Sequence, residues 1–460
     1  MDGRLAGWLL FAFAAIFGTG YVVSLPPFGW GDEVPHYLRA LRVSEGHLIP
    51  HLADGVRGAM VDPGVDQMLA GAAWTTVSWK ECTLRLSSLA PLFARRFGNR
   101  TRTFTPEYGA PYPPVGSLHI AAAMSFVRLF HPTPLAMLYA ARLANLAIWT
   151  TLVVVALRLI PALRLTLLAI VAAPTALFVA STCSLDGPLD GLAFLWFALM
   201  LRLAVRAEDT PRPVIVASIL ILGSLLAFIK LAYAPLVFLV LLIPAARKGR
   251  PWWRWIAICG GALALGFAAI ALWLRLVPLP TSVHFRDPIG GGPTGFDPSR
   301  LLENPMGVLA AVPRTIWVEA YPWLINLAWP QWTECLVAHH ITVPLVWGAL
   351  GIALAVDADG FRPTREQRVV GLSVFVGVLV ISVLVAFAAW TPGAESRAVG
   401  VHGRYLLPAL PALGLAAIPP ALGLPPRLRS ALRVTAVLAL VASVALVQIA
   451  FIRQYDWGPG

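Results

Sequence analysis

Charged residues are scarce in this chain of 460 residues, where Asp, Glu, Lys and Arg together make up 13%. Soluble proteins carry about 25% charged residues, so a soluble enzyme or a disordered chain is excluded. Cysteine is also rare, with four residues and no CxxC pair, which excludes a disulfide scaffold and leaves zinc and redox motifs without support. Apolar residues reach 58%, and this composition indicates a polytopic membrane protein.

Long apolar runs define the predicted fold class, an all-α polytopic membrane protein with about 11 transmembrane helices, within a range of about 10–13. The runs lie at residues 6–25, 134–157, 165–183, 188–205, 213–229, 232–244, 255–277, 340–356, 369–390, 404–423 and 433–453. The first run is too long for a signal-peptide core, and no cleavage-site pattern follows it. We treat residues 1–460 as a single membrane domain.

Loop charges predict the orientation of these helices. Fourteen Lys and Arg residues fall in one set of short loops beyond residue 133, and seven fall in the opposite loops of that part of the chain. The positive-inside rule makes the richer side cytoplasmic. Two long segments, 26–133 and 278–339, then form outer loops that carry interfacial helices, one of them at 112–130. All nine histidines fall on the outer side or at its edge, so we expect the chemistry to be extracytoplasmic.

The polar string 26–50 directly follows the first apolar run and carries the sharpest candidate site. Asp32-Glu33 stands at a predicted helix start, and Gly46 followed by Pro50 is expected to end the helix. A carboxylate just outside the membrane can act as a general base. The structural alternative is that Asp32 only caps an interfacial helix.

Helical spacing groups the polar side chains of this string into two faces. Asp32, His36 and Arg39 share one face, at positions i, i+4 and i+7. Glu33 and Tyr37 share the neighbouring face. We therefore take Asp32 and Glu33 as catalytic candidates, and His36, Tyr37 and Arg39 as candidates for binding substrate or phosphate.

Further candidates lie at predicted outer helix ends. Asp186 follows a Ser-Thr-Cys-Ser-Leu stretch and is costly at that depth unless it faces protein or water, although Asp-Gly-Pro also suits a turn. Lys230, three residues before Tyr233, either snorkels to the surface or binds an anion.

The string from Gly400 to Pro408 adds His402, Arg404 and Tyr405. A guanidinium suits bidentate phosphate binding, and the alternative here is an interfacial anchor formed by Arg and Tyr. Cys82 and Cys335 both fall in outer loops, where a disulfide would tie the two loops together.

Two of these strings resemble a known arrangement. Pro26, Asp32-Glu33, His36, Arg39-Ala40, Ser44-Glu45-Gly46 and Pro50, together with Gly403-Arg404-Tyr405-Leu406 and Pro408, look like the signature of a bacterial branch of predicted membrane proteins of unknown function. The order of first span, outer Asp-Glu helix, Pro-Pro interfacial helix, many spans and second outer loop resembles the GT-C superfamily of polytopic glycosyltransferases.

The resemblance implies a reaction as well as a fold. GT-C enzymes transfer a sugar from a polyprenyl-phosphate carrier to an acceptor on the outer face of the membrane, and the first acidic residue of the outer motif, here Asp32, is the usual base. In the aminoarabinose transferases a Lys precedes the Pro-Pro segment and touches phosphate. Tyr112 stands there in this chain, so we expect Arg404 and Lys230 to supply that contact.

The resulting hypothesis is an inverting glycosyltransferase of the bacterial cytoplasmic membrane, with its active site facing outside. Its expected partners are a polyprenyl-phosphate sugar donor, a glycan or glycolipid acceptor and membrane lipids, without nucleic acid. No cofactor is assigned, and a divalent metal on Glu33, Asp186 or histidines remains an option. The alternatives are a transporter or flippase, or an O-antigen polymerase or ligase, for lipid-linked glycans.

Overall fold

The structure is a computed structural model of the whole chain. It describes residues 2–29, 32–53, 56–75, 77–78, 83–85, 91, 94–97, 102–106, 112–130, 133–205, 212–246, 251–277, 299–303, 305–330, 339–389, 391, 396–453 and 455–456. Cys82 and Cys335, whose pairing the sequence left open, lie outside these residues.

Helices dominate the described chain, and the label η marks 3-10 helices, except η1, which is a π-helix. The first elements are α1 (Gly3–Phe13), η1 (Ala14–Gly18), α2 (Thr19–Ser24), α3 (Glu33–Ser44), β1 (His51–Ala53), β2 (Val56–Val61), α4 (Pro63–Thr75), β3 (Val77–Ser78), β4 (Thr83–Arg85), β5 (Thr103–Pro106), η3 (Pro114–Ser117) and α6 (Leu118–Arg128). The middle elements are α7 (Pro134–Leu159), α8 (Arg164–Val171), α9 (Pro174–Ala180), α10 (Asp186–Val205), α11 (Pro213–Ile229), η4 (Leu231–Leu241), α12 (Leu242–Ala245) and α13 (Trp252–Leu276). The last are α14 (Ser299–Glu303), α15 (Pro305–Ala328), α16 (His339–Ala358), α17 (Arg365–Ala389), η5 (Gly403–Ala409), α18 (Leu410–Ala417), α19 (Pro426–Arg453) and β6 (Tyr455–Asp456).

Seven helical stretches among the described residues are long and apolar enough to cross a membrane. They are Gly3–Ser24, Pro134–Leu159, Asp186–Val205, Trp252–Leu276, His340–Ala358, Arg365–Ala388 and Pro426–Arg453. Their length and apolar composition confirm the predicted class of a helical multi-pass membrane protein. Each coincides with one of the apolar runs that the sequence indicated.

The other four apolar runs form shorter or interrupted helices, so eleven crossings remain a prediction. Residues 165–183 form α8 and α9, which are separated at Ala173 because the residue before a proline avoids the helical conformation. The run 404–423 divides into η5 and α18, and 232–244 into η4 and α12. The segment 112–130 contains η3 and the 11-residue α6, which rises about 17 Å and is too short to span a membrane alone.

The segment between the first two long helices forms a small mixed unit that the sequence did not indicate. Strands β1, β2 and β5 pair antiparallel in one three-stranded sheet, and β3, β4 and β6 form a second one. Apolar side chains of α3, α4, α6 and the start of α7 share a core with Val61 of β2, including Leu38, Met68, Ile120 and Leu138. The second predicted outer loop, 278–339, contains α14 and the 24-residue α15.

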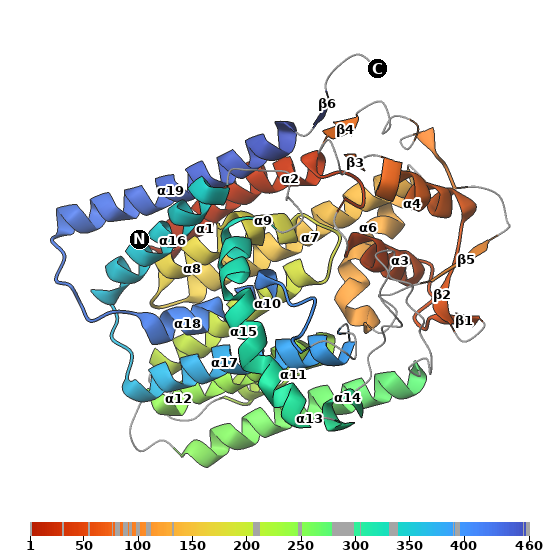
Figure 1. Cartoon of the computed structure of the whole chain (residues 1–460). Coiled ribbons are helices and arrows are strands. Elements are labelled where there is room, and N and C mark those ends of the chain that lie inside the picture. Colours follow the sequence, from red (N-terminus) through yellow and green to blue (C-terminus); the bar gives the residue numbers. More distant parts are fainter. Residues whose placement is uncertain are drawn as a thin grey trace.

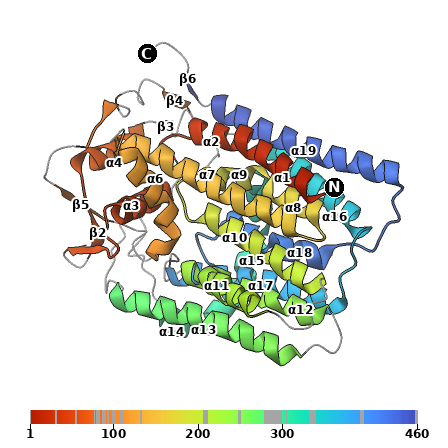
Figure 2. The same ribbon diagram turned by 180° about the vertical axis from the view of Figure 1, so that it is seen from behind.

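Helices α1, α7, α13 and α19 run in similar directions, α15 crosses them, and the mixed unit gathers at one end of the bundle (Figure 1 and Figure 2). Seen from behind, α7 lies beside α1 and α2 (Figure 2), which it contacts. Helix α10 is the most buried of the seven candidate spans and contacts α7, α9, α11, α12, η4 and η5. The N-terminus of α10 therefore brings its first residues against segments from distant parts of the chain.

Candidate functional site

Asp32 lies at the start of α3, and its side chain does not cap that helix. The helix begins at Glu33 as the sequence predicted, and no side-chain hydrogen bond from Asp32 reaches its first N–H groups. At the other end, Gly46 adopts a φ of +83° and donates its N–H to the Val43 carbonyl oxygen at 3.0 Å, which ends the helix. The Asp32 carboxylate is therefore available for a contact outside α3.

That contact is an ion pair with Arg404, a residue of η5. Nη2 of Arg404 donates to Oδ2 of Asp32, although 372 positions separate the two residues in the chain. The two side chains differ in exposure, because 39% of Asp32 and only 5% of Arg404 is accessible. The guanidinium is thus held inside the protein, while the carboxylate stays open to solvent on one side.

A second ion pair lies next to the first. Lys230, directly after α11, places its Nζ 2.7 Å from Oδ1 of Asp186, the first residue of α10. The other oxygen of Asp186 lies 3.4 Å from Nε of Arg404. Arg404 therefore links both carboxylates, and the four side chains Asp32, Arg404, Asp186 and Lys230 form one network, here called the charged cluster.

Aromatic rings enclose the two cations of the charged cluster. The Lys230 ammonium lies 4.2 Å from the ring centre of Tyr405 and 5.3 Å from that of Tyr233. The Arg404 guanidinium lies 4.9 Å from the ring of Tyr405. Such contacts stabilise a desolvated cation, so Lys230 is held in the interior and does not snorkel to the surface.

Several buried polar atoms around the charged cluster lack a hydrogen-bond partner within the described part of the chain. They are Nδ1 of His36, Nδ1 of His402, the Tyr233 hydroxyl and Oδ1 of Asp190. All four residues interact electrostatically with Lys230 and Asp186. Buried polar groups are nearly always satisfied by protein or water, so these atoms mark a place that suits the polar groups of a ligand.

Both histidines of the site favour their neutral forms. Burial lowers the pKa of His36 below its usual 6.5, and the nearby carboxylates of Asp32 and Asp186 oppose that effect only in part. Burial together with the Arg404 charge lowers the pKa of His402 to about 4. At neutral pH each ring then offers one donor and one acceptor nitrogen.

The backbone around Lys230 and Arg404 is unusual. Both residues adjoin or lie in 3-10 helices, η4 with Pro235 inside and η5 with Pro408 inside, and runs of this kind longer than a few residues are uncommon. Gly403 permits the packing of η5 on α15, because a Cβ atom there would lie 2.5 Å from the Trp323 carbonyl oxygen. Gly403 therefore fixes the position of the adjacent Arg404.

Glu33, a catalytic candidate from the sequence, has both carboxylate oxygens engaged in a buried ion pair. Arg142 of α7 donates from Nε to Oε1 at 2.8 Å and from Nη2 to Oε2 at 2.6 Å, and neither side chain is accessible to solvent. Oε1 also accepts the N–H of Cys183. This geometry is that of a structural link between α3, α7 and the turn before α10.

Tyr37 and Arg39 are also buried in structural contacts. The Tyr37 hydroxyl donates to the Pro134 carbonyl oxygen at 2.9 Å. Arg39 donates to the carbonyl oxygens of Tyr112 and Leu48 at 3.2 and 2.9 Å. Arg39 thereby holds Tyr112, whose ring centre lies 5.4 Å from that of His36, at the edge of the charged cluster.

The sequence did not point to two residues that support the site, Arg142 and Asn145. Arg142 is a cation inside an apolar run, a signal that by itself marks a structural or functional site. Asn145, one turn later, donates to the carbonyl oxygens of Thr182 and Ser184 at 2.6 Å and so fixes the turn that precedes Asp186. Among the described residues, no group of three His, Cys, Asp or Glu side chains is placed to hold a metal ion.

The eight remaining candidates from the sequence lie together in or beside the charged cluster. They are Asp32, His36, Asp186, Lys230, Tyr233, His402, Arg404 and Tyr405.

Residues 14–413 match a family model described as Predicted membrane protein (DUF2142). No curated protein and no solved structure matches the chain. The matched range covers most of the chain, and both resembling strings, 26–50 and 403–408, lie within it. The chain therefore belongs to the DUF2142 family of predicted membrane proteins.

Proposed function

We propose that this protein is an inverting glycosyltransferase of the GT-C type, with Asp32 as its general base. The donor is a sugar carried on polyprenyl phosphate, and the acceptor is a hydroxyl of a cell-envelope glycan or lipid. The observation that carries the proposal is the ion pair between Asp32 and Arg404, because it joins a partly exposed carboxylate to a buried guanidinium, which Asp186 links in turn to Lys230.

The cations suit the leaving group of this reaction. A departing polyprenyl phosphate develops negative charge, which preorganised cations stabilise strongly in a site that excludes water. Arg404 and Lys230 are held in such surroundings by Tyr405 and Tyr233. In the structure Arg404 pairs with Asp32, and Lys230 pairs with Asp186.

Donor binding would then free the base. The donor phosphate competes with Asp32 for the Arg404 guanidinium, and the released carboxylate accepts the proton of the acceptor hydroxyl. The acceptor oxygen bonds to the anomeric carbon while the bond from that carbon to the phosphate oxygen breaks. The phosphate keeps the electron pair, Asp32 keeps the proton, and attack from the opposite face inverts the anomeric configuration. Neutral His36 and His402 orient the sugar or acceptor by hydrogen bonds.

Loop charges support an outer location for this reaction. Ten of the fourteen positive residues of the short loops belong to the described part of the chain, and they lie at the other ends of the helices from the charged cluster. The positive-inside rule assigns those loops to the cytoplasm. We infer a bacterial cytoplasmic membrane with the site facing outwards.

The test is a transfer assay with membranes that contain the full chain. Polyprenyl-phosphate-linked pentoses and hexoses serve as donors, and extracted envelope glycolipids serve as acceptors. Asp32→Asn should lower transfer by about 100-fold or more, the usual contribution of a general base. Glu45→Gln is the matched control, since Glu45 follows the other end of α3 and pairs with Arg102 and Arg128.

Three results would count against the proposal. Full transfer by Asp32→Asn would overturn the role of Asp32. Movement of a carrier-linked sugar across a liposome bilayer, without transfer of any donor in the panel, would favour a flippase. Polymerisation of carrier-linked repeats would favour a polymerase or ligase instead.

A further inference from the structure

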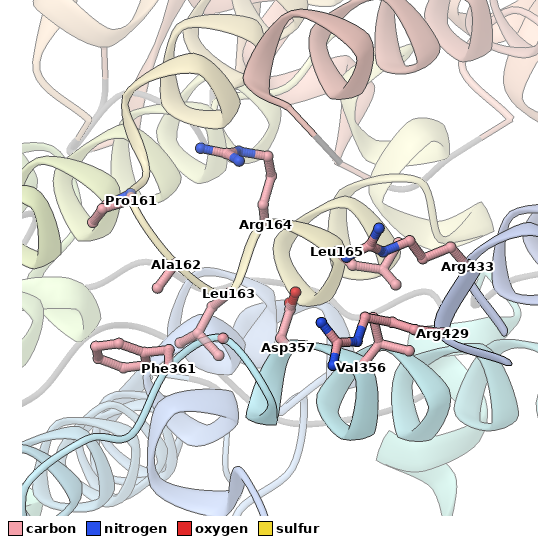
Figure 3. A pocket seen from close by; sticks show the side chains of 11 residues that line it. Pro161, Ala162, Leu163, Arg164, Leu165, Val356, Asp357, Phe361, Arg429 and Arg433 are labelled. Carbon is pink, nitrogen blue, oxygen red and sulfur yellow. The ribbon is translucent and has the colours of Figure 1, made fainter. Parts of the chain in front are cut away.

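A separate cavity lies at the opposite end of α7 from the charged cluster. Its volume is about 130 Å³, and it opens between the turn after α7, the C-terminal end of α16 and the N-terminal part of α19. Figure 3 shows its walls, with Arg164 at the start of α8, Asp357 near the end of α16, and Arg429 and Arg433 on α19. We call this space the basic cavity. Asn145 of α7 contacts the turn before Asp186, and the helix from Asn145 to Leu159 rises roughly 21 Å, so the two sites are separate.

The carboxylates of the basic cavity are engaged by backbone N–H groups. Oδ2 of Asp357 accepts the N–H and the hydroxyl of Thr166 at 2.8 and 2.9 Å, so Asp357 caps the start of α8 from another helix. Nearby, Asp359 accepts the N–H groups of residues 422–424, with distances of 2.8 to 2.9 Å. Each of these carboxylates therefore accepts hydrogen bonds from a helix start or a turn.

The arginines of the basic cavity are not equally compensated. Arg429 pairs with Asp359 at 2.9 Å, and Arg164 donates to the carbonyl oxygens of Leu157 and Ile160 at the end of α7. Arg433 lies one turn after Arg429 on the same face of α19. Within the described ranges the Arg433 guanidinium makes no hydrogen bond or ion pair. Its interaction with the Asp357 carboxylate is electrostatic and acts over a longer distance.

We propose that the basic cavity binds a phosphate group, with Arg433 as its principal donor. A half-buried guanidinium with no hydrogen bond or direct ion pair among the described residues favours an anion, and its planar fork matches phosphate oxygens in a bidentate manner. A water molecule takes about 30 Å³ of liquid volume, so the cavity has room for roughly four waters or one phosphate group. Its rim residues Pro161 and Gly360 are exposed, which leaves the site accessible.

The phosphate group in this cavity has two candidate sources, an anionic phospholipid headgroup and free inorganic phosphate. The loop charges assign this end of the protein to the cytoplasmic side, where anionic lipids attract basic segments. This site is distinct from the charged cluster and does not depend on the proposed sugar transfer.

The experiment measures thermal unfolding of the purified full chain in a neutral detergent, titrated with a short-chain phosphatidylglycerol, a short-chain phosphatidylcholine or inorganic phosphate. Arg433→Gln is compared with Arg427→Gln, a control because Arg427 is exposed on the first turn of the same helix and does not line the cavity. We expect phosphatidylglycerol to stabilise the wild type and the control, with an apparent affinity about 10-fold or more lower in Arg433→Gln. Phosphatidylcholine should have little effect.

A second variant covers the case in which Arg433→Gln fails to fold. Ala162→Leu reduces the space of the basic cavity with all charges unchanged, and should weaken binding in the same way. Stabilisation by inorganic phosphate with the same dependence on Arg433 supports the site and identifies free phosphate as its ligand. Equal stabilisation of wild type, Arg433→Gln and Arg427→Gln, or no stabilisation of the wild type by any probe, would overturn the proposal.

Discussion

Replacing Glu33 by Gln removes the negative charge from an ion pair that has no access to solvent. Arg142 makes five hydrogen bonds in the native protein, two of them to Glu33 and three to the carbonyl oxygens of Val22, Leu25 and Pro26. A Gln side chain with its oxygen in the place of Oε1 can still accept from Nε of Arg142 and from the Cys183 N–H. Its amide nitrogen then faces Nη2 of Arg142, donor against donor, and the guanidinium charge loses its counter-ion.

The expected loss of stability is large because the remaining charge is buried. Breaking a buried ion pair by removing one partner costs about 3–5 kcal/mol, a substantial part of a typical unfolding free energy of about 5–15 kcal/mol. The neighbouring Asp32 pair differs, since the Asp32 side chain is 39% exposed and the buried Arg404 keeps a second carboxylate, Asp186, at 3.4 Å from its Nε. Asp32→Asn should therefore fold almost as well as the wild type.

The assay is equilibrium unfolding in detergent micelles by titration with sodium dodecyl sulfate, followed by tryptophan fluorescence. Glu33→Gln, Asp32→Asn and wild type are compared at neutral pH. A loss below about 1 kcal/mol in Glu33→Gln, or equal losses in the two variants, would refute the division of this Asp-Glu pair into a structural residue and a site residue.

Three further predictions concern single residues. Burial lowers the pKa of His402 to about 4 from its usual 6.5, so the unfolded chain binds a proton that the folded chain excludes as the pH falls from 6.5 towards 4. Stability should decrease in that window, and His402→Gln should show a shallower decrease in thermal scans at stepped pH. Gly403→Ala should displace η5 from Trp323 and lower sugar transfer, whereas Gly351→Ala, where nothing lies within 4 Å of the added Cβ, should leave transfer unchanged. Tyr37→Phe should cost about 0.5–1.5 kcal/mol through the lost bond to a carbonyl oxygen and retain transfer activity; loss of activity at unchanged stability would contradict its structural role.

Side-chain periodicity and turn chemistry were sufficient for the local structure of the string 26–50. A helix from Glu33 ended by Gly46 follows from the spacing of polar residues and from the left-handed conformation that glycine tolerates. The same reasoning could not assign different roles to Asp32 and Glu33. Their side chains point in different directions from the helix, and the partner of each lies far away in the chain. The buried pair of Glu33 with Arg142 gives Glu33 a structural role, and the pair of Asp32 with Arg404 places Asp32 in the charged cluster.

The interrupted helices show a similar limit. Apolar runs of sufficient length predicted spans at 165–183 and 404–423, yet Pro174 and the 3-10 segment before α18 divide them. A hydropathy run reports composition over a window, whereas an interruption depends on whether neighbouring segments satisfy the freed backbone groups.

The sequence by itself determined the class of this protein, since 13% charge and 58% apolar residues suit only a chain that is solvated largely by lipid. It also indicated most of the site residues, because a charged side chain in apolar surroundings needs a partner or a function. Only the tertiary structure decided which of these charges meet. The pairing of Asp32 with Arg404, and of Asp186 with Lys230, joins residues from four segments of the chain, and contacts at such separations depend on how the helices pack.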